Sequence, residues 1–178
     1  YKILIMPLST KLDERNEDIK IYINGEFFHR DQAKISVFDS GFLLGDGIWE
    51  GIRLVNNSWL FLDEHLDRLY EGCKAIDIRL DEDKKFLTNA IIETQKINNI
   101  TDAAHARVMV TRGNKIKPFQ QPSLSKDGIN LVIIMEHSEE HPNTDGVKLV
   151  TVPQVRGLPM SQDPKLNSHS KLNCIIAC

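Results

Sequence analysis

The stretch that decides the fold covers residues 38–53 and reads Phe-Asp-Ser-Gly-Phe-Leu-Leu-Gly-Asp-Gly-Ile-Trp-Glu-Gly-Ile-Arg. Its glycines, at positions 41, 45, 47 and 51, mark places where the backbone bends or where another group must approach it closely. Trp49, Glu50 and Arg53 follow the turn and are predicted to lie on a strand. A glycine-rich turn that feeds a strand is therefore the expected centre of the domain.

The segment after this strand is predicted to be a helix over Leu62–Ile76, with Leu62, Leu66, Leu69 and Cys73 on one apolar stripe and Asp63 as its N-cap. It contains the run Glu-His-Leu-Asp-Arg-Leu at residues 64–69. Arg68 is a lone guanidinium in a mostly acidic neighbourhood, and its planar donors suit a bidentate anion such as a phosphate. The alternative is a surface arginine that pairs with Asp67 or Glu64.

The remaining elements follow from alternating or helical apolar spacing and from turn residues. They are a hairpin of Ile19–Ile23 and Glu26–His29 around Asn24-Gly25, a second hairpin of Gly51–Val55 and Ser58–Leu62 around Asn56-Asn57, a helix over Asp81–Asn98 with Phe86, Leu87, Ala90, Ile91 and Thr94 at helical spacing, strands at Ala104–Thr111 and Ile129–Glu136, and a loop over residues 114–128.

The domain organisation is predicted from composition. We expect an N-terminal extension at residues 1–18, an α/β domain (α+β in parts) at 19–137, a linker at 138–146, and the start of a second domain at 147–178. The second domain would open with a strand at Val147–Val152, a loop and a helix at Leu172–Cys178. One strand and one helix cannot close a core, so we expect the chain to be the front part of a longer protein.

Charge and composition exclude several classes of function. A net charge of -3 gives no reason to expect a nucleic acid or a membrane as partner, and no apolar run approaches the roughly 20 residues that span a bilayer. Three cysteines without a framework spacing argue against a disulfide scaffold and fit a reducing cytoplasm. Cys174 and Cys178 are expected on a buried helix face, and no metal site is predicted.

The glycine-rich stretch together with the pattern His65-x-x-Arg68-Leu69 resembles the class IV, or fold-type IV, pyridoxal-phosphate aminotransferases. That family includes branched-chain and D-amino-acid aminotransferases and aminodeoxychorismate lyase. The resemblance implies a two-domain fold whose second domain is truncated here, pyridoxal 5'-phosphate as cofactor, and a homodimer. It also implies transamination between a 2-oxo acid and an amino acid, with branched-chain or other aliphatic donors expected.

The same resemblance assigns roles to individual residues. Arg68 matches the arginine that binds the cofactor phosphate, and Trp49 matches an aromatic residue that lines the substrate pocket. His105 and Arg107 share one face of the predicted strand, where branched-chain enzymes hold a carboxylate with an aromatic-x-Arg pair. The alternative to this carboxylate-binding role is an exposed sheet face that carries two polar residues. Lys117 matches, only as a cation, an arginine with which D-amino-acid enzymes trap a carboxylate.

The motif that contains the cofactor-binding lysine is the one that departs from the family's spacing. The family shows Lys-x-x-Asn before a helix, whereas Lys171 is one residue too close to Asn173 and Ser170 occupies the strict lysine position. We predict Lys171, with Lys165 as the alternative and the absence of any such lysine as a third possibility. The shifted lysine leaves a degenerate, non-catalytic relative as one rival function, and the family resemblance leaves an aminodeoxychorismate-type lyase, which would use the same lysine, as the other.

Overall fold

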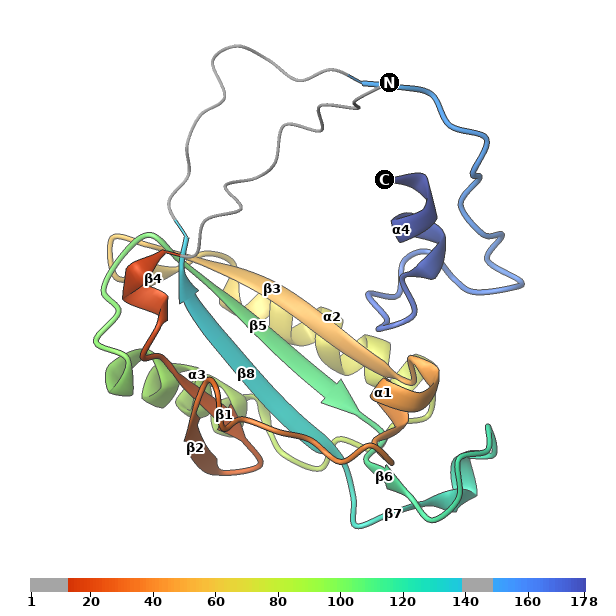
Figure 1. Cartoon of the computed structure of the whole chain (residues 1–178), viewed down its shortest axis with the longest axis horizontal. Coiled ribbons are helices and arrows are strands. Elements are labelled where there is room, and N and C mark those ends of the chain that lie inside the picture. The colour runs from red at the N-terminus through yellow and green to blue at the C-terminus, as the bar shows by residue number, and fades with distance from the viewer. Residues whose placement is uncertain (1–12, 139–148) are drawn as a thin grey trace.

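The computed structural model describes residues 13–138 and 149–178. The described part is built on a six-stranded antiparallel sheet in the order β2-β1-β8-β5-β3-β4 (Figure 1). The mixed α/β class expected from the sequence is confirmed. The strands are β1 (Lys20–Ile23), β2 (Glu26–His29), β3 (Gly47–Val55), β4 (Ser58–Trp59), β5 (Ala104–Thr111) and β8 (Asn130–His137), and a separate hairpin pairs β6 (Asn114–Lys115) with β7 (Ser125–Lys126).

Helices cover only one face of this sheet. The long helices α2 (Leu62–Ala75) and α3 (Lys84–Ile97) lie behind it in Figure 1, and the short helix α1 (Ser40–Leu44) sits at one end of β3. A final helix, α4 (Leu172–Ala177), follows the segment that returns to this end. The core lies between the sheet and the two long helices, and its largest members include Ile48, Ile52, Leu66, Leu69, Leu87, Ile91, Ile133 and Met135.

Both predicted hairpins are present, and their turn residues explain them. Asn24 and Gly25 have φ of 51° and 96°, and Asn56 and Asn57 have φ of 49° and 60°. Two consecutive residues with positive φ match the twist of paired strands, and asparagine and glycine adopt that conformation at the lowest cost.

The two long helices form where the apolar spacing predicts them, with differences at their starts. The prediction that Asp63 caps α2 was wrong, because the N-cap is Phe61, held at φ 52°. Asp63 lies in the first turn, where its charge still favours the helix dipole. In α3 the N-cap is Asp83, and Phe86 is 43% exposed, because Leu87, Ala90, Ile91 and Thr94 form the inner stripe.

Three further elements differ from expectation. The helix α1 was not predicted, since five residues are too few to show helical periodicity. Residues 114–128 contain the β6–β7 hairpin and a 3-10 helix, η2 (Pro122–Leu124), where a loop was expected. The strand predicted at Val147–Val152 was wrong over residues 149–152, which are irregular and leave Leu149 88% exposed. Its first two residues fall outside the described part of the chain.

The first residues that the structure describes belong to the expected N-terminal extension, and they pack on the sheet. The 3-10 helix η1 (Glu14–Asn16) places Asn16 against β8, where its side chain exchanges two hydrogen bonds with the His137 backbone at 2.9 and 2.7 Å. The rest of the predicted extension, residues 1–12, and almost all of the predicted linker lie outside the described residues.

The described helices include none that is long and apolar enough to cross a bilayer. All three cysteines are free thiols. Cys73 is buried in the core, and burial raises the pKa of its thiol to about 12. Cys174 and Cys178 are exposed, so the prediction of a buried face for them was wrong.

Candidate active site

The strand β3 separates two environments, because successive side chains point to opposite faces. Ile48, Glu50, Ile52 and Leu54 are fully buried beneath the helices. Trp49, Gly51 and Arg53 alternate with them and lie on the open face. Every residue of the decisive stretch after Gly47 therefore belongs either to the core or to a surface that no helix covers.

On the helix side, one buried carboxylate binds a guanidinium and an imidazole side chain. Glu50 has no exposed surface and accepts hydrogen bonds from Arg68 Nε and Nη2, both at 2.6 Å. His65 Nδ1 lies 2.8 Å from Oε2 of the same carboxylate. The hydrogen bonds to Glu50 raise the pKa of Arg68. Arg68 thus pairs with a strand residue, and not with Asp67 or Glu64, the alternative that its sequence left open.

This pairing holds Arg68 in one orientation while leaving it accessible. The guanidinium side chain is 54% exposed although its partner is completely buried. Nε and Nη2 are engaged with Glu50, and Nη1 makes no hydrogen bond within the described residues. A fixed guanidinium with an outward edge is the geometry with which arginine binds an oxyanion.

On the open face, three of the predicted site residues converge. The guanidinium carbon of Arg107 lies 4.2 Å from the centroid of the Trp49 ring, and Lys171 Nζ lies 5.4 Å from it. Cations at such distances are attracted by the electron-rich face of the indole. Trp49, Arg107 and Lys171 come from β3, β5 and the start of α4, so the three side chains meet only because the chain folds back on β3.

The segment before Lys171 reaches this place by pairing with the edge of β3. The Trp49 amide donates to the Asn167 carbonyl and the His169 amide donates to the Gly47 carbonyl, both at 2.9 Å. Ile48 and Ser168 form the antiparallel bridge between them. The Trp49 ring adds a bond from Nε1 to the Ser168 carbonyl at 3.1 Å.

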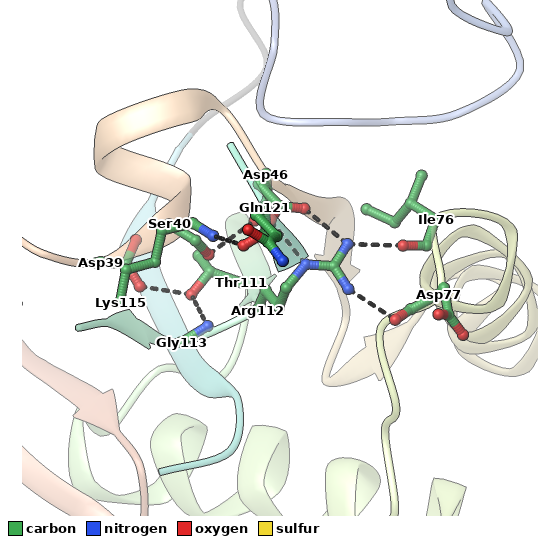
Figure 2. Close-up of polar contacts among 10 residues, drawn as sticks. All are labelled: Asp39, Ser40, Asp46, Ile76, Asp77, Thr111, Arg112, Gly113, Lys115 and Gln121. Atoms are coloured by element: carbon green, nitrogen blue, oxygen red, sulfur yellow. Dashed lines mark hydrogen bonds and ion pairs between the residues drawn. The ribbon is translucent and has the colours of Figure 1, made fainter. Parts of the chain in front are cut away.

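The turn that begins β3 is fixed by the polar network in Figure 2. Arg112 binds Asp46 through Nε and Nη2 at 2.7 and 3.0 Å, and donates to the carbonyls of Ile76 and Asp77 at the end of α2. Asp39 caps α1 and accepts from Thr111 Oγ1 at 2.5 Å. The network ties α1, β5 and the end of α2 together around the glycine-rich turn.

The glycines of the turn have two distinct causes. Gly45 ends α1 with φ of 70°, a left-handed conformation that glycine adopts most readily. Gly41 and Gly47 are needed for close approach: a Cβ would lie 2.5 Å from Thr111 Cγ2 at Gly41 and 2.6 Å from the Val110 carbonyl oxygen at Gly47, with the His169 ring next at 3.0 and 3.2 Å. The expectation that these positions bend or accept a close neighbour is confirmed.

Of the other predicted site residues, His105 lies beside the three that converge and Lys117 lies apart from them. His105 is next to Arg107 on the open face, with Nε2 2.7 Å from where a Cβ on Gly51 would stand. Burial, and then the charges of Arg107 and Arg53, lower the pKa of His105. Lys117 is exposed on the β6–β7 hairpin, and no contact of it with Trp49, Arg107 or Lys171 is seen among the described residues.

Three residues that hold site side chains were not assigned a role from the sequence. Glu50 and His65 hold Arg68, and their signal is the position of Glu50 on the buried face of β3 opposite a His-x-x-Arg helix turn. Asn167 accepts a hydrogen bond from Lys171 Nζ at 2.9 Å, and no local pattern announces that contact. The described residues include no cluster of three or more side chains that could hold a metal ion.

Comparison with known families decides the membership of this chain. The model of the family described as amino-transferase class IV matches residues 47–177. The chain belongs to the class IV amino-transferase family. The match begins at the first residue of β3 and includes Trp49, Arg68, Arg107 and Lys171.

Individual relatives agree with this membership. A putative branched-chain-amino-acid aminotransferase of Methanocaldococcus jannaschii is 36% identical over 160 residues, which are 89% of this chain and 54% of that protein. A branched-chain aminotransferase of the archaeon Thermoproteus uzoniensis, solved with norvaline, matches in fold with a TM-score of 0.77 at 21% identity, over 89% of this chain and 54% of that one. A 4-amino-4-deoxychorismate lyase of Pseudomonas aeruginosa matches with a TM-score of 0.65 at 23% identity, over 88% and 55%.

These matches confirm the fold-type IV architecture expected from the sequence. The chain spans about half the length of these relatives, and 29% of the length of two branched-chain-amino-acid aminotransferase-like proteins of Arabidopsis thaliana to which it is 32% identical. The class IV family includes aminotransferases and, among fold neighbours, a lyase, so the membership alone leaves the reaction and the substrate to be argued from the site.

Proposed function

We propose that the protein transfers an amino group between an amino acid and a 2-oxo acid with pyridoxal 5'-phosphate as cofactor, and that branched-chain or other aliphatic amino acids are its donors. The observation that carries this proposal is the convergence of Lys171 and Arg107 on the Trp49 ring, at 5.4 and 4.2 Å from its centroid. An amine, a guanidinium and an aromatic wall are the groups that an amino acid substrate needs from the protein.

The side chains present fit the cofactor. Arg68 offers its exposed guanidinium edge to the phosphate, and Lys171 offers an amine to the aldehyde. Arg68 and Lys171 flank the stretch Glu50–Ile52 of β3, which among the described residues has a paired strand only on its β5 side. When bound, pyridoxal phosphate supplies an electron-withdrawing ring that stabilises negative charge at the α-carbon of the amino acid.

Each residue then has a task of its own. Lys171 would hold the cofactor by its aldehyde, and its amine would serve as the group that accepts and returns a proton. Arg107 binds the substrate carboxylate through charge-assisted hydrogen bonds. Trp49 forms the wall against which the amino acid side chain packs.

The preference for aliphatic donors is supported by the surface next to Trp49. Met109 pairs with Trp49 across the strands, and Ile134 pairs with Arg107, and both contribute to a cavity of about 520 Å³ on the open face. Ile21, Phe42 and Val132 extend the same lining. Trp49, Arg107 and Lys171 do not line this cavity themselves, and Arg30, Lys34, Asp39 and Glu136 also contribute to it. Its apolar residues Met109 and Ile134 are nevertheless cross-strand neighbours of Trp49 and Arg107, and they favour a hydrocarbon side chain.

The decisive experiment uses the full-length protein with pyridoxal phosphate, borohydride reduction, and mass spectrometric mapping of the pyridoxylated lysine. We expect the label on Lys171, its loss in Lys171→Arg, and its retention in Lys165→Arg. A label on Lys165 would leave the proposed function standing and make Lys165, not Lys171, the lysine that binds the cofactor. No label on either lysine would overturn the proposal and favour a degenerate relative.

Substrate turnover separates the two enzymatic possibilities. An aminotransferase converts leucine, isoleucine or valine only when a 2-oxo acid acceptor is present, whereas a lyase of the aminodeoxychorismate type releases pyruvate without an acceptor. Dependence on the acceptor is the expected result. Activity on D-alanine but not on the L-branched-chain donors would overturn the substrate part of the proposal.

The proposal includes a homodimer and a cytoplasmic location. Phe42 on α1 and Ile116 and Phe119 on the β6–β7 hairpin are 57–68% exposed, and apolar side chains of this size on projecting elements suit packing against a second copy. The three free thiols fit a reducing compartment. Light scattering on the full-length protein measures the assembly, and a monomeric mass at micromolar concentration would overturn this part.

A further inference from the structure

Lys171 is one residue out of register with the family pattern, yet its amine lies on the substrate-facing side of β3. Something in this chain must hold it there. The contact that does so is the 2.9 Å hydrogen bond from Lys171 Nζ to Asn167 Oδ1. The two residues are four apart, and both precede the regular part of α4.

Asn167 is itself placed by groups other than its side chain. Its carbonyl accepts the Trp49 amide at 2.9 Å, in the bridge that fastens residues 167–169 to β3. The ring of His169 seats between Gly41 and Gly47, which fixes the next residues of the segment. The backbone from which the Asn167 side chain extends is therefore held in place. Its carboxamide reaches the Lys171 amine, which also lies over the Trp49 ring.

We propose that Asn167 is a positioning residue, whose carboxamide holds the Lys171 amine at the Trp49 ring and so makes a lysine at a shifted position usable for binding the cofactor aldehyde. This inference rests on the proposed function, because it assigns Asn167 a task only if Lys171 binds the cofactor. Ser170, at the strict family position, packs its backbone on Gly45, where a Cβ would lie 3.2 Å from it.

A first experiment tests the contact without the cofactor. Cofactor-free, full-length protein is labelled with trace acetic anhydride near pH 8, and the acetylation of Lys171 is divided by that of Lys165, an exposed lysine of the same segment. An acceptor on the ammonium favours it over the free amine, and the reagent attacks only the free amine. We expect the ratio to rise severalfold in Asn167→Leu and to fall about tenfold in Asn167→Asp.

The matched control is Gln162→Leu. Gln162 Nε2 donates to Ser168 Oγ at 2.7 Å, so this variant removes an amide that holds the same segment without touching Lys171. The ratio should stay within about twofold of the wild-type value. An equal change of the acetylation ratio in Gln162→Leu would overturn the inference, because the effect would then come from general loosening of the segment. An unchanged ratio in both Asn167 variants would also overturn it, because the hydrogen bond would then have no effect on the Lys171 amine.

A second experiment tests the positioning role itself. With pyridoxal phosphate and borohydride, trapping on Lys171 should fall about tenfold in both Asn167→Leu and Asn167→Asp. The leucine variant fails because its amine is no longer held, and the aspartate variant fails because its amine stays protonated. Opposite effects on acetylation with the same effect on trapping form a pattern that mere loss of structure does not produce.

The two proposals fail in different ways. If wild-type protein is not trapped at Lys171, the proposed function falls and the positioning role with it, while the acetylation order still reports the contact. If wild-type protein is trapped at Lys171 and both Asn167 variants are trapped equally well, the proposed function stands and Asn167 has no positioning role.

Discussion

The two faces of the sheet are built from the same strands but by different rules. The face beneath α2 and α3 consists mostly of buried apolar side chains, interrupted by one carboxylate, Glu50, which pairs with Arg68 and lies within hydrogen-bond distance of His65. The open face carries Trp49, Arg53, His105 and Arg107, each only half-buried. Packing defines the first face except at Glu50, which orients Arg68, and polar and aromatic side chains define the second.

This contrast teaches that alternation along a strand separates stability from function in one sequence. A change at one residue of β3 acts on the core, and a change at the next acts on the site. The predictions that follow test this separation, beginning with the largest expected effect.

A truncation in the covered face should destabilise the domain far more than one on the open face. Ile52 is fully buried, so Ile52→Ala should lower the free energy of unfolding by about 3–4 kcal/mol. The matched change Met109→Ala on the open face should cost about 1 kcal/mol. Hydrogen exchange of the β3 and β5 amides in the full-length protein measures both, and equal losses would contradict the division into two faces.

The ionic cluster beneath the sheet should couple stability to cofactor binding. Arg68→Leu leaves the buried Glu50 carboxylate with His65 alone, and should cost about 2 kcal/mol, less than a fully buried pair would because Arg68 is 54% exposed. The double variant Glu50→Leu with Arg68→Leu should recover most of this loss.

Binding of pyridoxal phosphate distinguishes the two roles of Arg68. The double variant should stay at least about tenfold weaker for the cofactor, since a charge-assisted bond to the phosphate is gone. Thermal unfolding and fluorescence titration give the two quantities. Restored cofactor affinity in the double variant would show that Arg68 serves structure alone.

Removing a cation from the open face should weaken the use of the amino donor and leave the stability almost unchanged. Arg107→Leu should raise KM for the amino donor about tenfold or more, with the free energy of unfolding altered by less than about 1 kcal/mol. Arg53→Leu, on the same face but bonded to Ser138, is the control, and its KM should not change. Similar increases in KM for both variants would point to a general field effect and against a specific contact by Arg107.

The smallest expected effect is a dependence of stability on pH from the open-face histidines. Burial lowers the pKa of His105 and of His169 below the ordinary value. As the pH falls, these imidazoles therefore bind protons more readily in the unfolded chain than in the folded one. The free energy of unfolding is thus highest above about pH 6.5 and falls as the pH drops below it.

Thermal unfolding at pH 7.5 and pH 5.5 measures this dependence. His105→Gln and His169→Gln should each lose less stability than wild type over this range, by less than about 1 kcal/mol per histidine. A wild-type slope retained in both variants would assign the acid sensitivity to groups outside the open face.

Much of the sheet and its helices could be predicted because their signals are local. The Asn24-Gly25 and Asn56-Asn57 turns specify hairpins through residues that accept positive φ. The stripe of Leu66, Leu69 and Cys73 specifies the buried face of α2. The short helix α1 and the β6–β7 hairpin were missed because each is too short for a periodic pattern to form.

The candidate site was predicted residue by residue but not as an arrangement. Arg68 could be singled out from its helix turn, yet Glu50, the partner that orients it, lies 18 residues away on another element. Lys117 matched a family position in sequence, and the structure places it on an exposed hairpin apart from the Trp49 ring.

The sequence by itself determined the alternation of β3, the turns, the helical stripes and the family, because each depends on neighbours within a few residues or on a matched motif. Only the tertiary structure decided that Lys171, 122 positions from Trp49, lies over its ring, since that contact depends on residues 167–169 pairing with the edge of β3. Backbone hydrogen bonds form between groups that every non-proline residue carries, so no sequence pattern predicts such a pairing. The requirement for glycine at positions 41 and 47 also comes from the tertiary structure, because Thr111, the Val110 carbonyl and His169 all approach these positions from distant parts of the chain.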